Sequence, residues 1–143
     1  MKLEDTRAEY YYFTGKVSDI VRQLGLAGVA IIWVFKTESE GKKTIPEGLV
    51  PAGVLILLGL ATDLLQYAAG TIIWDRFNIK KENELEEKRT EKEAHGEDYD
   101  PEAEDFSAPS SINDLTKTLF WVKFLLMFLA YLYLIFYLIT RLL

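Results

Sequence analysis

Apolar residues gather in three blocks of the chain, and charged residues fill the stretches between them. A soluble domain would instead spread its core residues over short periodic elements. The blocks cover residues 19–35, 49–74 and 115–143. The second and third are long enough for a helix, rising about 1.5 Å per residue, to cross a bilayer core of about 30 Å. The pattern therefore predicts an all-α integral membrane protein with three transmembrane helices.

The first block is the shortest, at about 17 residues, which is the lower end of what spans a bilayer. Arg22 and Gln23 lie in its first turns, and Trp33 and Lys36 occupy the positions of an aromatic anchor and a flanking cation at an interface. An interfacial or re-entrant helix therefore remains the alternative for this block. The third block carries eight aromatic residues, which we expect to form a packing surface.

The segments between the blocks differ in length and charge. Residues 36–48 predict a short external loop that joins two antiparallel helices. Residues 75–95 contain no Gly or Pro and are rich in helix formers, which predicts a charged cytoplasmic extension of the second helix. Residues 96–112 follow as an acidic linker, with the composition of a disordered or partner-ordered segment.

The ends of the chain indicate its orientation. Residues 1–18 carry acids and four consecutive aromatic residues, and predict an amphipathic segment broken at Gly15. This beginning does not resemble a cleaved signal peptide. Basic residues near the membrane are more numerous on the face of the N-terminus and residues 75–118 than on the opposite face. The positive-inside rule therefore places the N-terminus in the cytoplasm.

Composition excludes several kinds of chemistry. The chain has no cysteine, and its one histidine, His95, stands in a polar stretch without a second imidazole, so we expect no disulfide, no metal site and no cofactor. The net charge of −6 is local, because residues 75–106 carry six basic and thirteen acidic side chains, a net of −7. The sequence contains no basic stripe of the kind that would predict nucleic-acid binding. The sequence also contains no pairing of a nucleophile with a base that would predict an enzyme.

Charged side chains inside a membrane are costly and usually face a partner or a water-filled cavity. Asp63 lies near the middle of residues 49–74, about 16 Å from Trp74 by helical rise. Arg22 and Lys123 lie nearer the helix ends and can extend toward water. The residues predicted to form a polar intramembrane network are Arg22, Gln23, Asp63, Gln66 and Lys123.

Small residues repeat on the same helix faces and predict close helix packing. Asp63 shares one stripe with Ala52, Ile56, Gly59, Gln66, Gly70 and Ile73, at spacings of four and three. The predicted packing glycines are Gly25, Gly28, Gly59 and Gly70. Two interpretations of the stripe remain open. Its polar residues pair with the cations of the other two helices within one bundle, or they face other subunits and line a polar path through an oligomer.

Several short motifs resemble a family of small, uncharacterised bacterial inner-membrane proteins with three spans. They are the series Tyr11-Tyr12-Phe13-Thr14-Gly15-Lys16, Ser18-Asp19-Ile20 and Arg22-Gln23-Leu24, then Asp63-Leu64-Leu65-Gln66-Tyr67, and Phe106-Ser107-Ala108-Pro109. The resemblance covers all three spans. It implies a multi-pass protein of the bacterial inner membrane and adds no mechanism.

Two functional hypotheses follow. The first is a small homo-oligomeric protein whose polar stripe forms a pore or perturbs the membrane, as an effector of a defence or toxin system would. The second is a non-conducting membrane subunit that recruits a cytoplasmic protein through residues 75–114. The residues predicted to dock this partner are the acids of the linker: Glu97, Asp98, Asp100, Glu102, Glu104 and Asp105.

Overall fold

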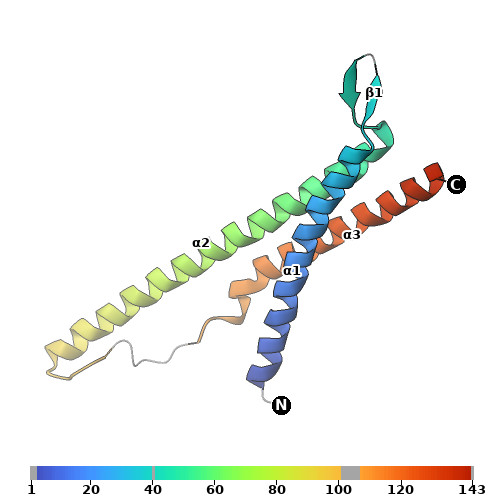
Figure 1. The fold of residues 1–143 in the computed structure, drawn as a ribbon. Coiled ribbons are helices and arrows are strands. Elements are labelled where there is room, and N and C mark those ends of the chain that lie inside the picture. Colours follow the sequence, from blue (N-terminus) through green and yellow to red (C-terminus); the bar gives the residue numbers. More distant parts are fainter. Residues whose placement is uncertain (1–2, 40, 101–106, 143) are drawn as a thin grey trace.

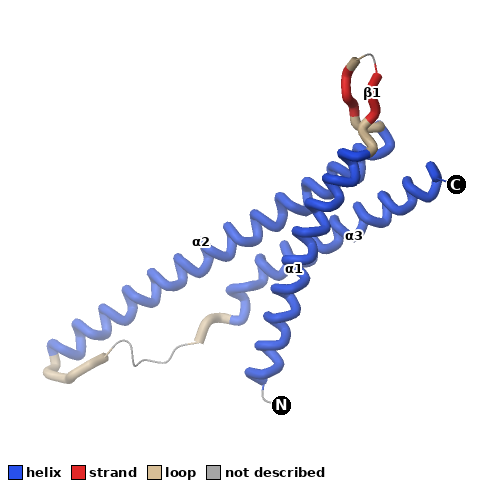
Figure 2. The backbone as a smooth tube through the Cα atoms, in the orientation of Figure 1, coloured by secondary structure: helices blue, strands red, loops and turns tan. Residues whose placement is uncertain are grey.

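The computed structural model describes residues 3–39, 41–100 and 107–142, and almost all of them are helical (Figures 1 and 2). The helices are α1 (Leu3–Val34), α2 (Val50–Ala94) and α3 (Asp114–Leu142). Short 3-10 turns, η1 (Glu47–Leu49) and η3 (Ser110–Asn113), precede α2 and α3. Each of the three helices is long and apolar enough to cross a membrane.

The most extensive helix contact is between α2 and α3, which lie side by side, while α1 crosses this pair obliquely (Figure 1). The N-terminus and the far end of α2 lie at one end of the molecule, and the loop after α1 and the C-terminus lie at the other. The buried core is formed where the three helices meet, by Val21 and Ile32 of α1, Leu49 of η1, Ala52 and Ile56 of α2, and Met127, Ala130 and Leu134 of α3.

Helix α1 differs from the sequence expectation in its length. It continues from Leu3 to Val34 through Gly15, where the sequence pattern suggested a break. Its apolar segment covers the 21 residues Thr14–Val34, so it begins before Asp19 and is longer than the segment of about 17 residues expected from the sequence. A glycine inside a helix costs only about 0.5–1 kcal/mol relative to alanine, which neighbouring turns can offset.

The segment expected to be a plain loop after α1 contains a small hairpin. Strands β1 (Thr37–Ser39) and β2 (Lys42–Thr44) pair antiparallel, with Thr37 opposite Thr44. Gly41 in the turn has a φ of 75°, a conformation that glycine adopts without steric cost. The fold is therefore helical with one two-stranded hairpin at its end.

Helix α2 is a single element of 45 residues that joins two very different compositions. It passes from the apolar residues 50–74 into the charged residues 75–94 without interruption. It ends in a Schellman motif, because Gly96 has a φ of 76° and the Glu97 and Gly96 N–H groups donate to the Lys92 and Glu93 carbonyls. The charged helical extension inferred from the lack of Gly and Pro is thus present as a helix.

The aromatic residues of α3 divide between packed and exposed positions. Phe120 is buried, and Tyr131, Tyr133 and Tyr137 pack against the core, as expected for a packing surface. Trp121, Phe124, Phe128 and Phe136 are exposed. The buried side of α3 is formed by Phe120, Lys123, Met127, Ala130 and Leu134, at spacings of three and four. This spacing defines one helical face, and the four exposed rings lie outside it.

Candidate functional site

Asp63 of α2 lies at the centre of a charge cluster between the three helices. Its Oδ1 accepts a hydrogen bond from Lys123 Nζ of α3. Its Oδ2 accepts from Arg22 of α1, at 3.1 Å from Nε and 2.9 Å from Nη2. One carboxylate therefore connects all three helices, and each of its oxygens is paired.

Lys123 is the most deeply buried member of the cluster, with none of its surface exposed. Besides Asp63, its ammonium donates to Ser18 Oγ at 2.8 Å. It also lies 5.5 Å from the ring centroid of Phe120 and 5.8 Å from that of Tyr67, within the range of cation–π attraction. A buried ammonium costs several kcal/mol unless it is paired, and here a carboxylate, a hydroxyl and two aromatic rings offset that cost.

Arg22 closes the cluster on its outer side, and 44% of its side chain is exposed. Its guanidinium lies 3.8 Å from Asp19 one turn earlier and 5.5 Å from the ring centroid of Tyr67. Together the four ionisable groups comprise two cations, Arg22 and Lys123, and two carboxylates, Asp63 and Asp19. The cluster is formally neutral, so the helices hold charged side chains without a net buried charge.

Helical periodicity places these residues together. On α1 the buried positions are Ser18, Val21, Gly25, Gly28 and Ile32, and on α2 they are Ala52, Ile56, Gly59 and Asp63. Both series follow spacings of three and four, which keep residues on one face of a helix. The stripe that carries Asp63 therefore faces α1 and α3 of the same chain.

Glycines allow the backbones to approach at this contact. A Cβ on Gly25 would lie 2.7 Å from Leu60 Cδ2, and one on Gly28 would lie 2.6 Å from Ile56 Cδ1. Gly59 faces Met127 at 3.3 Å, while Gly70 is looser, with Thr116 at 3.5 Å. The two glycines of α1 thus occupy the closest part of the contact with α2, as expected for small residues between apolar helices.

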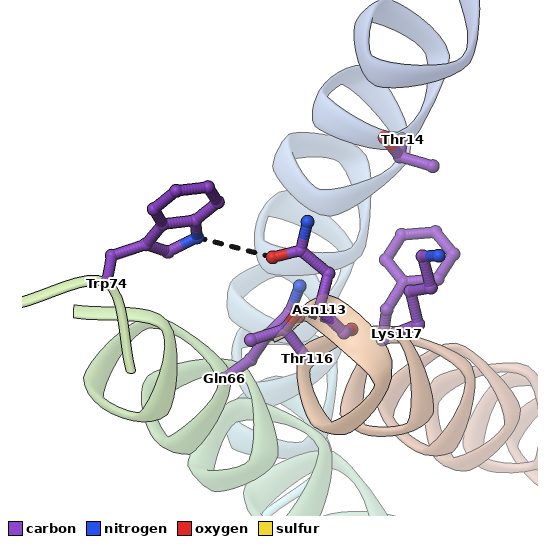
Figure 3. Close-up of a pocket in the computed structure, with 7 residues that line it drawn as sticks. Thr14, Gln66, Trp74, Asn113, Thr116 and Lys117 are labelled. Atoms are coloured by element: carbon purple, nitrogen blue, oxygen red, sulfur yellow. Dashed lines mark hydrogen bonds between the residues drawn. The ribbon is translucent and has the colours of Figure 1, made fainter. Parts of the chain in front are cut away.

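Two residues of the predicted network lie outside the cluster. Gln23 is exposed on α1. Gln66, one turn after Asp63, lines a separate cavity of about 490 Å³ between the helices (Figure 3). The cavity is also lined by Thr14, Trp74, Asn113, Thr116, Lys117 and Phe120. The Trp74 indole N–H donates to Asn113 Oδ1 at 3.2 Å and connects α2 to the start of α3.

The predicted docking acids lie beyond the end of α2. Glu97, Asp98 and Asp100 are exposed, which leaves their carboxylates accessible to solvent. Glu102, Glu104 and Asp105 lie outside the described residues.

Sequence reasoning missed Ser18, Tyr67 and Phe120 as members of the cluster. Ser18 carried a detectable signal, because it lies four residues before Arg22 and three before Val21, on the apolar face of α1. A small hydroxyl residue on such a face needs a hydrogen-bond partner. The aromatic residues carried no comparable signal, since their contact with Lys123 depends on how α2 and α3 cross.

The cluster links the three helices through ion pairs and hydrogen bonds. Among the described residues no group of three or more His, Asp or Glu side chains is arranged to hold a metal ion. Comparison with protein families, with curated proteins and with solved structures found no match. The resemblance to small bacterial membrane proteins therefore stays a prediction.

Proposed function

We propose that the chain is a three-span protein of the bacterial inner membrane that does not conduct ions and serves as an anchor for a rigid helical arm, residues 75–94 of α2. The arm would recruit a soluble protein on the cytoplasmic side. The observation that carries this proposal is the complete pairing of Asp63 with Arg22 and Lys123 of its own chain.

This pairing argues against a pore. A polar path through an oligomer requires the stripe on α2 to face water or other subunits. Asp63 is only 5% exposed, and Ala52, Ile56 and Gly59 on the same stripe are buried in the chain's own bundle. The exposed charges of the cluster are Arg22, which is bonded to Asp63, and Asp19, which pairs with Arg22.

The arm supports the recruiting role. Twenty residues of helix extend about 30 Å at about 1.5 Å per residue, and nearly all of them are exposed. Lys81 donates to Glu84, and Arg89 to Glu93, one turn away on the same helix. Such local pairs favour the helix, and the Schellman motif at Gly96 ends it cleanly. The acids at residues 97–105 complement a basic surface on the partner.

Single-cysteine labelling tests the three-span arrangement. The chain has no cysteine, so Lys43→Cys in the hairpin and Asn83→Cys in the arm each create a unique thiol. In intact cells a membrane-impermeant maleimide should label residue 43, and should label residue 83 only after the membrane is permeabilised. Equal labelling of both thiols in intact cells would contradict the topology.

Photo-crosslinking tests the arm. A photoreactive amino acid at Asn83 or Glu87 should give the same discrete cytoplasmic adduct, and the matched position Lys43 in the hairpin should not. Replacing Glu97, Asp98 and Asp100 by their amides should reduce the adduct, because the partner surface is expected to be basic. An adduct that is unchanged by these replacements would remove the acidic segment from the proposal.

A membrane-potential dye tests conduction directly. Induced expression of the wild-type chain should leave the potential unchanged. Depolarisation by the wild type that disappears in Asp63→Asn would favour a pore instead. A native mass spectrum in detergent completes this test, because a monomer provides no shared pore.

A further inference from the structure

The cavity beside Gln66 is the part of the molecule that the anchor role does not use. It lies where the apolar part of α2 ends at Trp74 and where α3 begins, with Lys117 on its rim (Figure 3). Tryptophan and lysine at this position are typical of the interface between hydrocarbon and headgroups. The cavity volume of about 490 Å³ is within the range of small-ligand sites.

One residue that lines the cavity has an acceptor without a partner among the described residues. Gln66 Oε1 is buried and makes no hydrogen bond within that part of the chain, although most buried polar atoms in proteins are paired. Two donors on the cavity wall are already used, because the Trp74 indole N–H donates to Asn113 Oδ1 and the Thr116 hydroxyl donates to the Asn113 carbonyl. A hydrogen-bond donor for Gln66 Oε1 would therefore have to enter the cavity from outside the bundle.

We propose that this cavity binds the headgroup of a glycerophospholipid that carries a hydrogen-bond donor, either a primary ammonium or a hydroxyl. The donor bonds to Gln66 Oε1, and the phosphate pairs with the Lys117 ammonium at the rim. Phe120 and the exposed apolar residues of α3 lie beside the acyl chains. Basic sites between helices at this depth are known to recognise headgroups in this way.

The common headgroups differ in whether they carry a hydrogen-bond donor. Phosphatidylethanolamine offers an ammonium with three N–H groups, and phosphatidylglycerol offers hydroxyls. Phosphatidylcholine has the same phosphate but a quaternary ammonium without a donor. Selection for the first two over the third therefore reports the hydrogen bond to Gln66 rather than general lipid adhesion.

The test is native mass spectrometry of the full chain in detergent with equal amounts of the three lipids, all with identical acyl chains. We expect the ethanolamine and glycerol lipids to be retained about tenfold over the choline lipid, the ratio that one buried hydrogen bond of ordinary strength provides. Equal retention of all three would overturn the proposal.

Variants assign the preference to the cavity. Gln66→Leu should abolish the preference, whereas Gln66→Glu, which keeps an acceptor, should preserve retention of the ethanolamine lipid. Lys117→Gln should weaken retention of all three lipids by removing the phosphate contact. Gln23→Leu, at an exposed glutamine of α1, is the matched control and should change nothing. A preference that survives Gln66→Leu would show that the acceptor is satisfied by water and would overturn the assignment.

A soluble ligand is the other source of the same chemistry. Phosphoethanolamine, added at the lipid concentration, should not displace the lipid, because it lacks the acyl chains. Complete displacement would identify a soluble metabolite site and contradict the lipid proposal. The proposal rests on the membrane placement argued above but not on the arm. Loss of headgroup preference with intact cysteine-labelling topology would therefore reject only the lipid site.

Discussion

Helix α2 carries two kinds of ion pair, and they differ in almost everything except the groups involved. In the apolar half, Asp63 bonds to residues 41 and 60 positions away in the sequence. In the charged half, Lys81 and Arg89 bond to glutamates three and four positions away. The first kind is enclosed by other helices and the second is surrounded by solvent. The contribution of each pair to the free energy of unfolding is therefore expected to depend on its burial rather than on its bond geometry.

The largest effect is expected from removing one partner of the buried pair. Asp63→Leu leaves the Lys123 ammonium buried without a counter-charge, which should lower the free energy of unfolding by about 3–5 kcal/mol. The measurement is an SDS titration of the purified chain in mixed micelles, followed by circular dichroism.

The matched control for this change is the double variant Asp63→Leu with Lys123→Met, which replaces both buried charges by apolar groups. It should recover most of the lost stability, because paired removal avoids an isolated charge. If the double variant is as unstable as the single one, the loss comes from packing and not from charge.

A smaller effect is expected where the helices approach most closely. Gly25→Ala brings a Cβ to 2.7 Å from Leu60 and 3.1 Å from Met127, and overpacking of this kind costs about 1–3 kcal/mol. Gly15→Ala is the control, because no heavy atom lies within 4 Å of its Cβ. The same titration should show Gly15→Ala neutral or slightly stabilised, so equal losses in both variants would contradict a specific contact at Gly25.

Arg22→Gln should have a still smaller effect. The side chain is 44% exposed, and Asp63 keeps its bond to Lys123 after the change. We expect a loss of about 1 kcal/mol in the same titration, the upper end for pairs open to solvent. A loss as large as that of Asp63→Leu would show that Arg22, not Lys123, is the main counter-charge.

The smallest effect is expected in the arm. The Lys81 ammonium lowers the pKa of Glu84 from its ordinary value of 4.5. A lowered carboxyl pKa stabilises the folded arm above that ordinary value, and the stabilisation is lost as the pH falls through the lowered one. Helicity of the arm should therefore decrease only in acid. Glu84→Gln should reduce this pH dependence, leaving the part that comes from the Arg89–Glu93 pair, and should leave the global unfolding midpoint unchanged. A large midpoint shift would show that the arm packs on the bundle.

Local patterns predicted the helices better than the contacts between them. The end of α2 near Gly96 and the charged extension could be inferred because helix propensity and glycine act within a few residues. The β1–β2 hairpin was missed because its strands are only three residues long and lack apolar alternation. Continuation of α1 through Gly15 was missed because a glycine signal alone does not decide whether neighbouring turns compensate.

The charge cluster shows the same limit at the level of single residues. Asp63 could be selected from the sequence because it is a lone carboxylate in a long apolar segment. That both Arg22 and Lys123 reach it, and that Gln66 does not join them, depends on the relative rotation of three helices. No local pattern encodes that rotation, so the sequence left both internal pairing and an oligomeric path open.

The unbroken course of α2 has a mechanical consequence. A helix that is clamped at Asp63 and stays straight to Ala94 works as a lever, and its outer part turns with its inner part. A change of about 10° in tilt, such as a different bilayer thickness produces, would move the tip of this lever, about 46 Å from Asp63 to Ala94, by about 8 Å. A protein bound to the arm would then sense the thickness of the membrane without touching it.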